Sequence, residues 1–225
     1  MTDNDTRRYE MFLRVQQLGT DEAASFASNI FITDLFSNLS QVITELETHT
    51  SAQASGRTTA RQGTKSKGVA RDELERGLNA ISRTARSMAR TVPGLEQKFH
   101  FPRAVKDQDL LAIARMFATD ALPLKAEFIK RGLPANFLDD LNDDIAAFEE
   151  AITQRTQGTN THVTARAAID DLIEKGMEIV RELDPVMRNI FEDNAGNLAP
   201  WLSASRVERA PRSKATQLQQ PSPTT

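Results

Sequence analysis

The chain of 225 residues contains no cysteine. This absence excludes disulfide bonds, thiolate zinc sites and cysteine nucleophiles. Long hydrophobic runs are also missing, since no uninterrupted apolar stretch approaches the roughly 18 residues that a membrane-spanning helix needs. The chain begins MTDNDTRRYE, and no apolar stretch of signal-peptide length follows these charged residues. We therefore expect a cytoplasmic protein without a transmembrane segment.

Histidine is scarce, and its three copies are not placed for a di-iron site in a helical bundle. Such a site needs a glutamate three residues before a histidine on two helices. The histidines are His49, His100 and His162, and the residues three positions before them are Leu46, Gln97 and Thr159. Glu45 and His49 share a helical face, but two ligands do not complete a metal site. We expect neither a metal nor a cofactor.

Catalytic motifs are absent as well. Four carboxylate doublets look suggestive at first: Asp139-Asp140, Asp143-Asp144, Glu149-Glu150 and Asp170-Asp171. Adjacent residues on a helix point about 100° apart, so a doublet does not make an acid/base pair. No phosphate loop and no nucleophile with a neighbouring base accompanies them. The sequence therefore predicts a protein that is not an enzyme.

What the chain does contain is regular helical spacing of apolar residues. Two stripes repeat at alternating intervals of four and three residues: Leu74, Leu78, Ile81, Ala85, Met88 and Val92, then Ile169, Ile173, Gly176, Val180, Leu183, Met187 and Ile190. Two more precede them: Ile32, Leu35, Leu39, Val42 and Leu46, then Leu138, Leu141, Ile145, Phe148 and Ile152. This heptad spacing keeps one face of a helix against a partner. It predicts an all-α fold.

Two segments nearly repeat each other and suggest an internal duplication. Residues 63–71 read GTKSKGVAR and residues 158–166 read GTNTHVTAR, and each precedes a long stripe. We interpret each copy as a helical hairpin with a polar loop, in which Ser66 and Thr161 cap the second helix. The hairpins span about 20–92 and about 134–195. Together they predict a four-helix bundle that forms one domain over residues 1–202.

Accessory elements are expected outside the two hairpins. The connection over about 93–133 is too long for a bare loop, so it should contain short helices, one around Leu110 to Phe117 and one after Pro123. Another short helix should include Phe12 and Leu18. From residue 203 to 225 the chain has almost no apolar residues, which predicts a disordered tail. Trp201, just before it, is expected to anchor the chain to the bundle.

Charge is segregated between the two halves. Residues 51–92 contain nine Lys and Arg against three acids, a net charge of +6, whereas residues 134–195 contain five against fourteen, a net charge of −9. The basic loop and helix over 57–90 could bind a polyanion, either a nucleic acid or an anionic surface. Its contact residues would be Arg57, Arg61, Lys65, Lys67 and Arg71. No aromatic residue in 51–92 is available to stack on a base, which counts against nucleic acid.

The duplicated charges also suggest ion pairs. Arg71 and Arg166 occupy equivalent positions, and so do Glu47 and Glu149. We expect each hairpin to be closed by one pair, Arg71 with Glu47 and Arg166 with Glu149, in bidentate geometry.

Two functions remain open from the sequence. The first is a helical interaction or scaffold protein that binds a protein partner, or a second copy of itself, through a bundle face or the C-terminal tail. The alternative is polyanion binding through the basic segment 57–90. Retention on a heparin column distinguishes them, because only the alternative predicts it.

Overall fold

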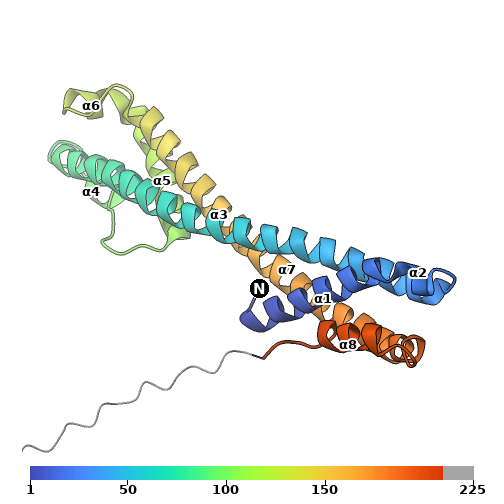
Figure 1. Ribbon diagram of the computed structural model, residues 1–225. Helices are drawn as coiled ribbons and strands as arrows, with labels where there is room; N and C mark the ends of the chain where they lie inside the picture. Colours follow the sequence, from blue (N-terminus) through green and yellow to red (C-terminus); the bar gives the residue numbers. More distant parts are fainter. Residues whose placement is uncertain (210–225) are drawn as a thin grey trace, which may run out of the picture. The chain divides into compact units, whose positions relative to one another are not determined.

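The computed structural model describes residues 1–209, and every regular element in that range is a helix (Figure 1). The all-α prediction is confirmed. In chain order the elements are α1 (Asp3–Asp21), α2 (Ala23–Phe26), α3 (Ile30–Met88), α4 (Leu95–Lys98), α5 (Asp107–Ala121), a 3-10 turn (Leu122–Leu124), α6 (Lys125–Lys130), α7 (Phe137–Ile190) and α8 (Ala195–Ala204). Two helices are long, with 59 residues in α3 and 54 in α7.

The chain forms two compact units, and both draw residues from α3 and α7. The first unit contains residues 1–50 together with those from Arg166 on, and the second contains residues 51–165. Each unit has its own hydrophobic core. The expectation of a single domain over 1–202 is not tested by this division and stays a prediction.

The predicted apolar stripes are buried except at Val92 and Ile190, which are 47 % and 36 % exposed, but their partners differ from those expected. Leu39 is 0 % exposed and Val180 is 5 % exposed, and both belong to the core of the first unit. Ile81 and Ile145 are 2 % and 7 % exposed and belong to the core of the second. The early stripe of α3 therefore packs with the late stripe of α7, and the late stripe of α3 packs with the early stripe of α7.

The predicted loops inside the hairpins are wrong. α3 and α7 are continuous, so both repeated segments are helical, and Ser66 and Thr161 lie in helix interiors rather than at caps. The segments 20–92 and 134–195 are not hairpins, and the structure does not confirm a duplicated four-helix bundle. The reason is that heptad spacing continues across the polar segment on small residues, which pack without bulky apolar side chains. In α3 these residues are Gly56, Ala60, Gly63 and Ala70.

The first unit is built from α1, α8, the start of α3 and the end of α7. Phe12 and Trp201 are fully buried in its core. The indole N–H of Trp201 donates a hydrogen bond of 2.9 Å to Asp184, so the one polar atom of this side chain is satisfied inside the core. Both the N-terminal helix and the anchoring role of Trp201 are confirmed.

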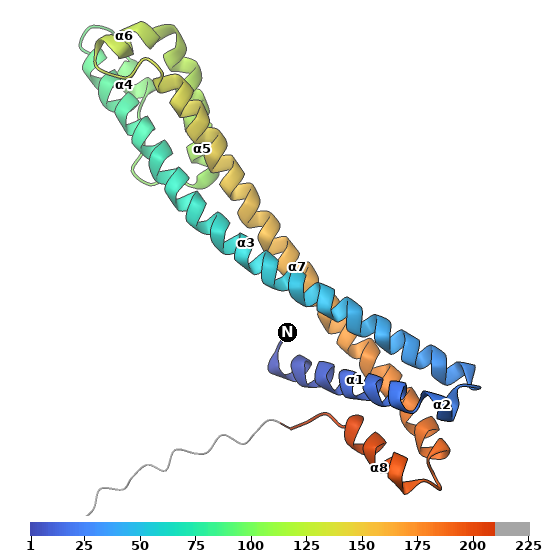
Figure 2. The ribbon, with the colours of Figure 1, turned by 45° about the horizontal axis from the view of Figure 1, so that its top comes forward.

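The second unit adds α4, α5 and α6 to the end of α3 and the start of α7, and Figure 2 shows α5 running alongside the long helices. Phe99 lies between Phe117 and Phe128, with edge-to-face ring centroids 5.2 and 5.5 Å away. These rings anchor the connection on the core. The expected helices in the connection are confirmed as α5 and α6.

The predicted boundary of the tail at residue 203 is wrong. α8 includes Ser203 and Ala204, and Ala204 is buried, so these residues belong to the first unit. Beyond the helix, Glu208 forms an ion pair of 3.4 Å with Arg14, and the carbonyl of Arg206 accepts a hydrogen bond from the same arginine. The prediction of disorder over 210–225 lies outside the described residues.

Candidate functional site

In the second unit, α3 and α7 approach each other through glycines. A Cβ atom on Gly56 would lie 2.7 Å from the backbone N of His162, and one on Gly158 would lie 2.4 Å from the backbone N of Ala60. A Cβ atom on Gly63 would meet backbone of the opposite helix at 2.6 Å. These distances leave no room for a side chain, so the two helix backbones are in contact. Each glycine costs about 1 kcal/mol of helix propensity, which the close packing must offset.

A groove of about 390 Å³ runs beside this contact. Its lining combines basic, hydroxyl and small side chains from both helices: Arg57, Ala60, Arg61 and Thr64 from α3, and Arg155, Thr159 and His162 from α7. We call this set the arginine groove. Arg57 and Arg61 are four residues apart and therefore share one face of α3. Since the backbones touch, the lining of the groove comes from side chains at the flanks of the contact.

The helix segments around the groove contain no carboxylate. Residues 51–71 of α3 and 151–165 of α7 include neither aspartate nor glutamate. Within the described part of the chain, the side chains of Arg57, Arg61 and Arg155 make no hydrogen bond or ion pair. Three exposed arginines thus line one groove, and none of them has an acidic partner among the described residues. A bound anion would supply that partner.

The threonine hydroxyls in the groove are not available as donors. Thr64 donates to the carbonyl of Ala60 at 2.9 Å, and Thr159 donates to the carbonyl of Arg155 at 2.9 Å. An anion would therefore receive its hydrogen bonds from the guanidinium groups and from the half-buried ring of His162.

Two of the predicted polyanion contacts are neutralised from within the unit. Asp107, at the start of α5, accepts hydrogen bonds from Lys67 at 2.6 Å and from Arg71 at 2.7 Å. The hydrogen bond from Lys67, supported by the charge of Arg71, lowers the pKa of Asp107 despite its partial burial. Arg71 also donates to the carbonyl of Val105. Of the predicted set, Arg57 and Arg61 line the groove and Lys65 is exposed. Lys67 and Arg71 form ion pairs with Asp107.

The predicted pair of Arg71 with Glu47 is wrong. Because α3 is continuous, these residues stand 24 positions apart on one helix and do not face each other across a hairpin. Arg71 instead pairs with Asp107 and, at 2.8 Å, with Glu75. Glu47 accepts a hydrogen bond of 2.7 Å from Tyr9.

The second predicted pair, Arg166 with Glu149, is wrong for the same reason, since both residues lie on the continuous helix α7. Arg166 pairs with Asp5 and with Asp170, each at 2.6 Å. Glu149 pairs with Arg115 of α5.

Sequence reasoning missed Arg155 and His162 as members of the basic site. Both belong to the acidic half of the chain, whose net charge concealed them. Two signals could have found them: the carboxylate-free run around them, and Gly158 placed at a heptad position between them. Small residues at such positions indicate close helix contact, which brings the opposite flanks together.

In the part of the chain that the structure describes, no group of three or more histidine and acidic side chains is placed to hold a metal ion. Over residues 1–209, no helix combines the length and the apolar character needed to cross a membrane. No family model matches the chain, and no curated protein or solved structure matches it.

Proposed function

We propose that this chain is a non-enzymatic protein that binds the phosphate backbone of a nucleic acid in the arginine groove. One observation supports this proposal above the others: Arg57, Arg61 and Arg155 line a single groove without any carboxylate partner among the described residues. A guanidinium group donates two parallel hydrogen bonds to a phosphate, and it is always charged at physiological pH. Phosphates would therefore replace the missing acidic partners.

The shape of the site favours a nucleic acid over a flat lipid surface as its ligand. The basic side chains line a concave groove between two helices, whereas a lipid surface would be met most easily by a convex basic face. No Phe, Tyr or Trp side chain lines the groove, so no large aromatic ring is available there for a base to stack on. We infer that the protein contacts the backbone of a duplex by charge and does not read its sequence.

Salt-dependent binding of a duplex tests this proposal. The affinity of the full chain for a fluorescent DNA duplex of about 20 base pairs is measured by anisotropy over a salt series. Each phosphate contact contributes about −0.9 to the slope of log affinity against log salt, so the variant Arg57→Gln/Arg61→Gln/Arg155→Gln should lower its magnitude by about 2.7. Circular dichroism verifies that the variant is folded.

The control removes the same charge elsewhere in the second unit. Arg83, Arg90 and Arg103 are exposed and make no described ion pair, so changing all three to glutamine should leave the slope nearly unchanged. An equal decrease of the salt slope in both variants would show diffuse electrostatic attraction and would refute binding in the arginine groove. A wild-type chain that does not bind duplex DNA even at low salt would refute the function. Binding to anionic vesicles but not to DNA would assign the groove to lipid instead.

The first interpretation of the sequence, a helical interaction or scaffold protein that binds a protein partner or a second copy, stays a prediction. Val69 and Val163 favour it, since they are 59 % and 60 % exposed in the second unit and would be covered by such a contact. The proposed role of the tail over 210–225 concerns residues outside the described part. Light scattering tests self-association, because a dimer would show twice the chain mass of 25.0 kDa.

A further inference from the structure

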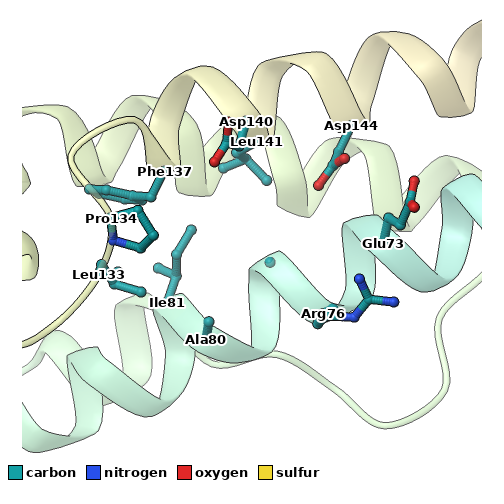
Figure 3. Close-up of a pocket in the computed structure, with 11 residues that line it drawn as sticks. Glu73, Arg76, Ala80, Ile81, Leu133, Pro134, Phe137, Asp140, Leu141 and Asp144 are labelled. Atoms are coloured by element: carbon teal, nitrogen blue, oxygen red, sulfur yellow. The ribbon is translucent and has the colours of Figure 1, made fainter.

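A second cleft in the second unit has the opposite charge. It lies between α3, α7 and the segment that precedes α7, and has a volume of about 470 Å³ (Figure 3). Its lining is formed by Glu73, Arg76, Gly77, Ala80 and Ile81 of α3, by Leu133 and Pro134, and by Phe137, Asp140, Leu141 and Asp144 of α7. We call it the acidic cleft. Clefts that hold small molecules commonly span about 300 to 1,000 Å³.

The cleft has an apolar end and a charged end. Figure 3 shows Leu133, Pro134 and Phe137 together at one end, while the carboxylate of Asp144 points from α7 toward α3 at the other. Glu73 lies opposite Asp144 on α3. This arrangement suits a ligand that has a hydrophobic body and one polar head group.

The carboxylates at the charged end lack partners. Over residues 1–209, neither Glu73 nor Asp144 makes a hydrogen bond or an ion pair, although Arg76 lines the same cleft. Burial raises the pKa of Asp144, and repulsion from Glu73 and Asp140 raises it further, whereas the charge of Arg76 lowers it in part. The pKa is raised on balance, so a cation bound between these carboxylates would favour the charged form of Asp144.

Gly77 leaves space on the α3 wall of the cleft. A Cβ atom there would meet only Asp144 Oδ2 at 3.7 Å and Leu141 Cδ1 at 4.0 Å, which are ordinary contact distances. Unlike Gly56 and Gly158, this glycine is not required by the packing of the two helices. Any larger side chain at Gly77 would extend into the acidic cleft.

We propose that the acidic cleft binds a small organic cation with an apolar body, such as a primary amine that carries an aromatic or aliphatic group. The ammonium group donates hydrogen bonds to Asp144 and Glu73, and the apolar body packs against Phe137, Pro134 and Ile81. The site and its ligand class are independent of the arginine groove. The failure of either proposal leaves the other unaffected.

Two probes of equal shape test the role of charge. The ¹⁵N-labelled full chain is titrated with 2-phenylethylammonium and, separately, with the neutral 2-phenylethanol, and the amide signals of Gly77 and Ala80 are followed by NMR. We expect saturable shifts with the amine and at least about tenfold weaker binding of the alcohol, since the alcohol cannot form the charge-assisted hydrogen bonds of the ammonium group. Equal binding of both probes, or saturation by neither, would overturn the proposal.

Variants then localise the site. Asp144→Asn should weaken amine binding about tenfold, whereas Asp143→Asn, at an exposed neighbour outside the cleft, should not. Gly77→Leu should abolish binding by filling the cleft, and Gly77→Ala shows whether a side chain is tolerated there by the fold. If Gly77→Leu does not fold, the comparison of the two aspartate variants decides. Equal losses in Asp143→Asn and Asp144→Asn would place the amine elsewhere.

Discussion

Gly158 of α7 lies directly against Ala60 of α3: a Cβ atom on the glycine would be 2.4 Å from the alanine nitrogen and 2.8 Å from the carbonyl oxygen of Gly56. Both are contacts with backbone atoms, which a change of side-chain rotamer cannot relieve. The contact positions both walls of the arginine groove. It is therefore the first place at which the architecture of the second unit can be tested.

Gly158→Ala should destabilise the protein by about 1 to 3 kcal/mol, the usual cost of overpacking. The gain of about 1 kcal/mol in helix propensity offsets part of the clash. Urea unfolding followed by circular dichroism measures the change. Gly68→Ala is the matched control, because Gly68 also lies inside a long helix but has nothing within 4 Å of its Cβ position. It should be stabilising, and a neutral Gly158→Ala would contradict the close contact.

Asp107→Asn should cost about 1 to 2 kcal/mol, since it removes a carboxylate that accepts charge-assisted hydrogen bonds from Lys67 and Arg71. Part of the loss has another source, because Asp107 also lies in the first turn of α5. Asp109→Asn controls for that part: Asp109 is an exposed acid of the same turn. Urea unfolding of both variants isolates the bridge. Similar losses would show that the bridge contributes nothing beyond the helix dipole.

The same carboxylate predicts a pH dependence. Hydrogen bonding from Lys67 lowers the pKa of Asp107 below its ordinary 3.8 in the folded chain. The stabilisation is thus complete above that ordinary value and is lost as the pH falls through the lower folded value. The difference in unfolding free energy between wild type and Asp107→Asn should shrink as the solution is acidified below pH 3.8. A difference that stays constant down to pH 2, about two units lower, would contradict this.

Tyr9 provides a clean optical test of the first unit, because it is the only tyrosine in the chain. Burial, together with the hydrogen bond that it donates to Glu47, raises its pKa from 10.0 to about 12. Tyrosinate absorbance should therefore rise with a midpoint near pH 12 in the folded chain and near pH 10 in urea. The folded state retains its proton longer, so this contribution to stability is lost as the pH rises from 10 toward 12.

Glu47→Gln tests the cause of that shift. It removes the negative charge beside the phenol, so the midpoint should fall only partly, because burial is the larger cause. An unchanged midpoint would show that Glu47 has no influence on Tyr9.

Asp5→Ala should destabilise the first unit by about 1 to 3 kcal/mol. The Asp5 carboxylate is buried and accepts hydrogen bonds from Arg166 at 2.6 Å and from the Thr2 backbone at 2.7 Å. Fluorescence of Trp201, the only tryptophan and a member of the same core, follows unfolding in urea. Asp3→Ala controls for the loss of an acid from the first turn of α1, and it should cost less than about 1 kcal/mol. Equal losses of unfolding free energy in the two variants would show that the ion pair of Asp5 with Arg166 does not stabilise the unit.

The sequence predicted the stripes and the helical class because large apolar residues at intervals of three and four leave few alternatives. Leu39 and Ile81 are buried as expected. It did not predict the continuity of α3 through Gly56 and Gly63, since glycine is usually read as a helix breaker. The arginine groove was half predicted: Arg57 and Arg61 were found by local charge, but Arg155 could not be assigned to them from a distant and acidic part of the chain.

By itself, then, the sequence determined that the chain is helical and which face of each apolar stripe is buried, because both follow from local spacing and the avoidance of water by apolar groups. Only the tertiary structure decided which stripes meet, which arginines keep a carboxylate partner and where the two helix backbones touch. Those outcomes depend on contacts between residues far apart in the chain. The role of a glycine can be assigned only when the atoms that face its Cβ position are known.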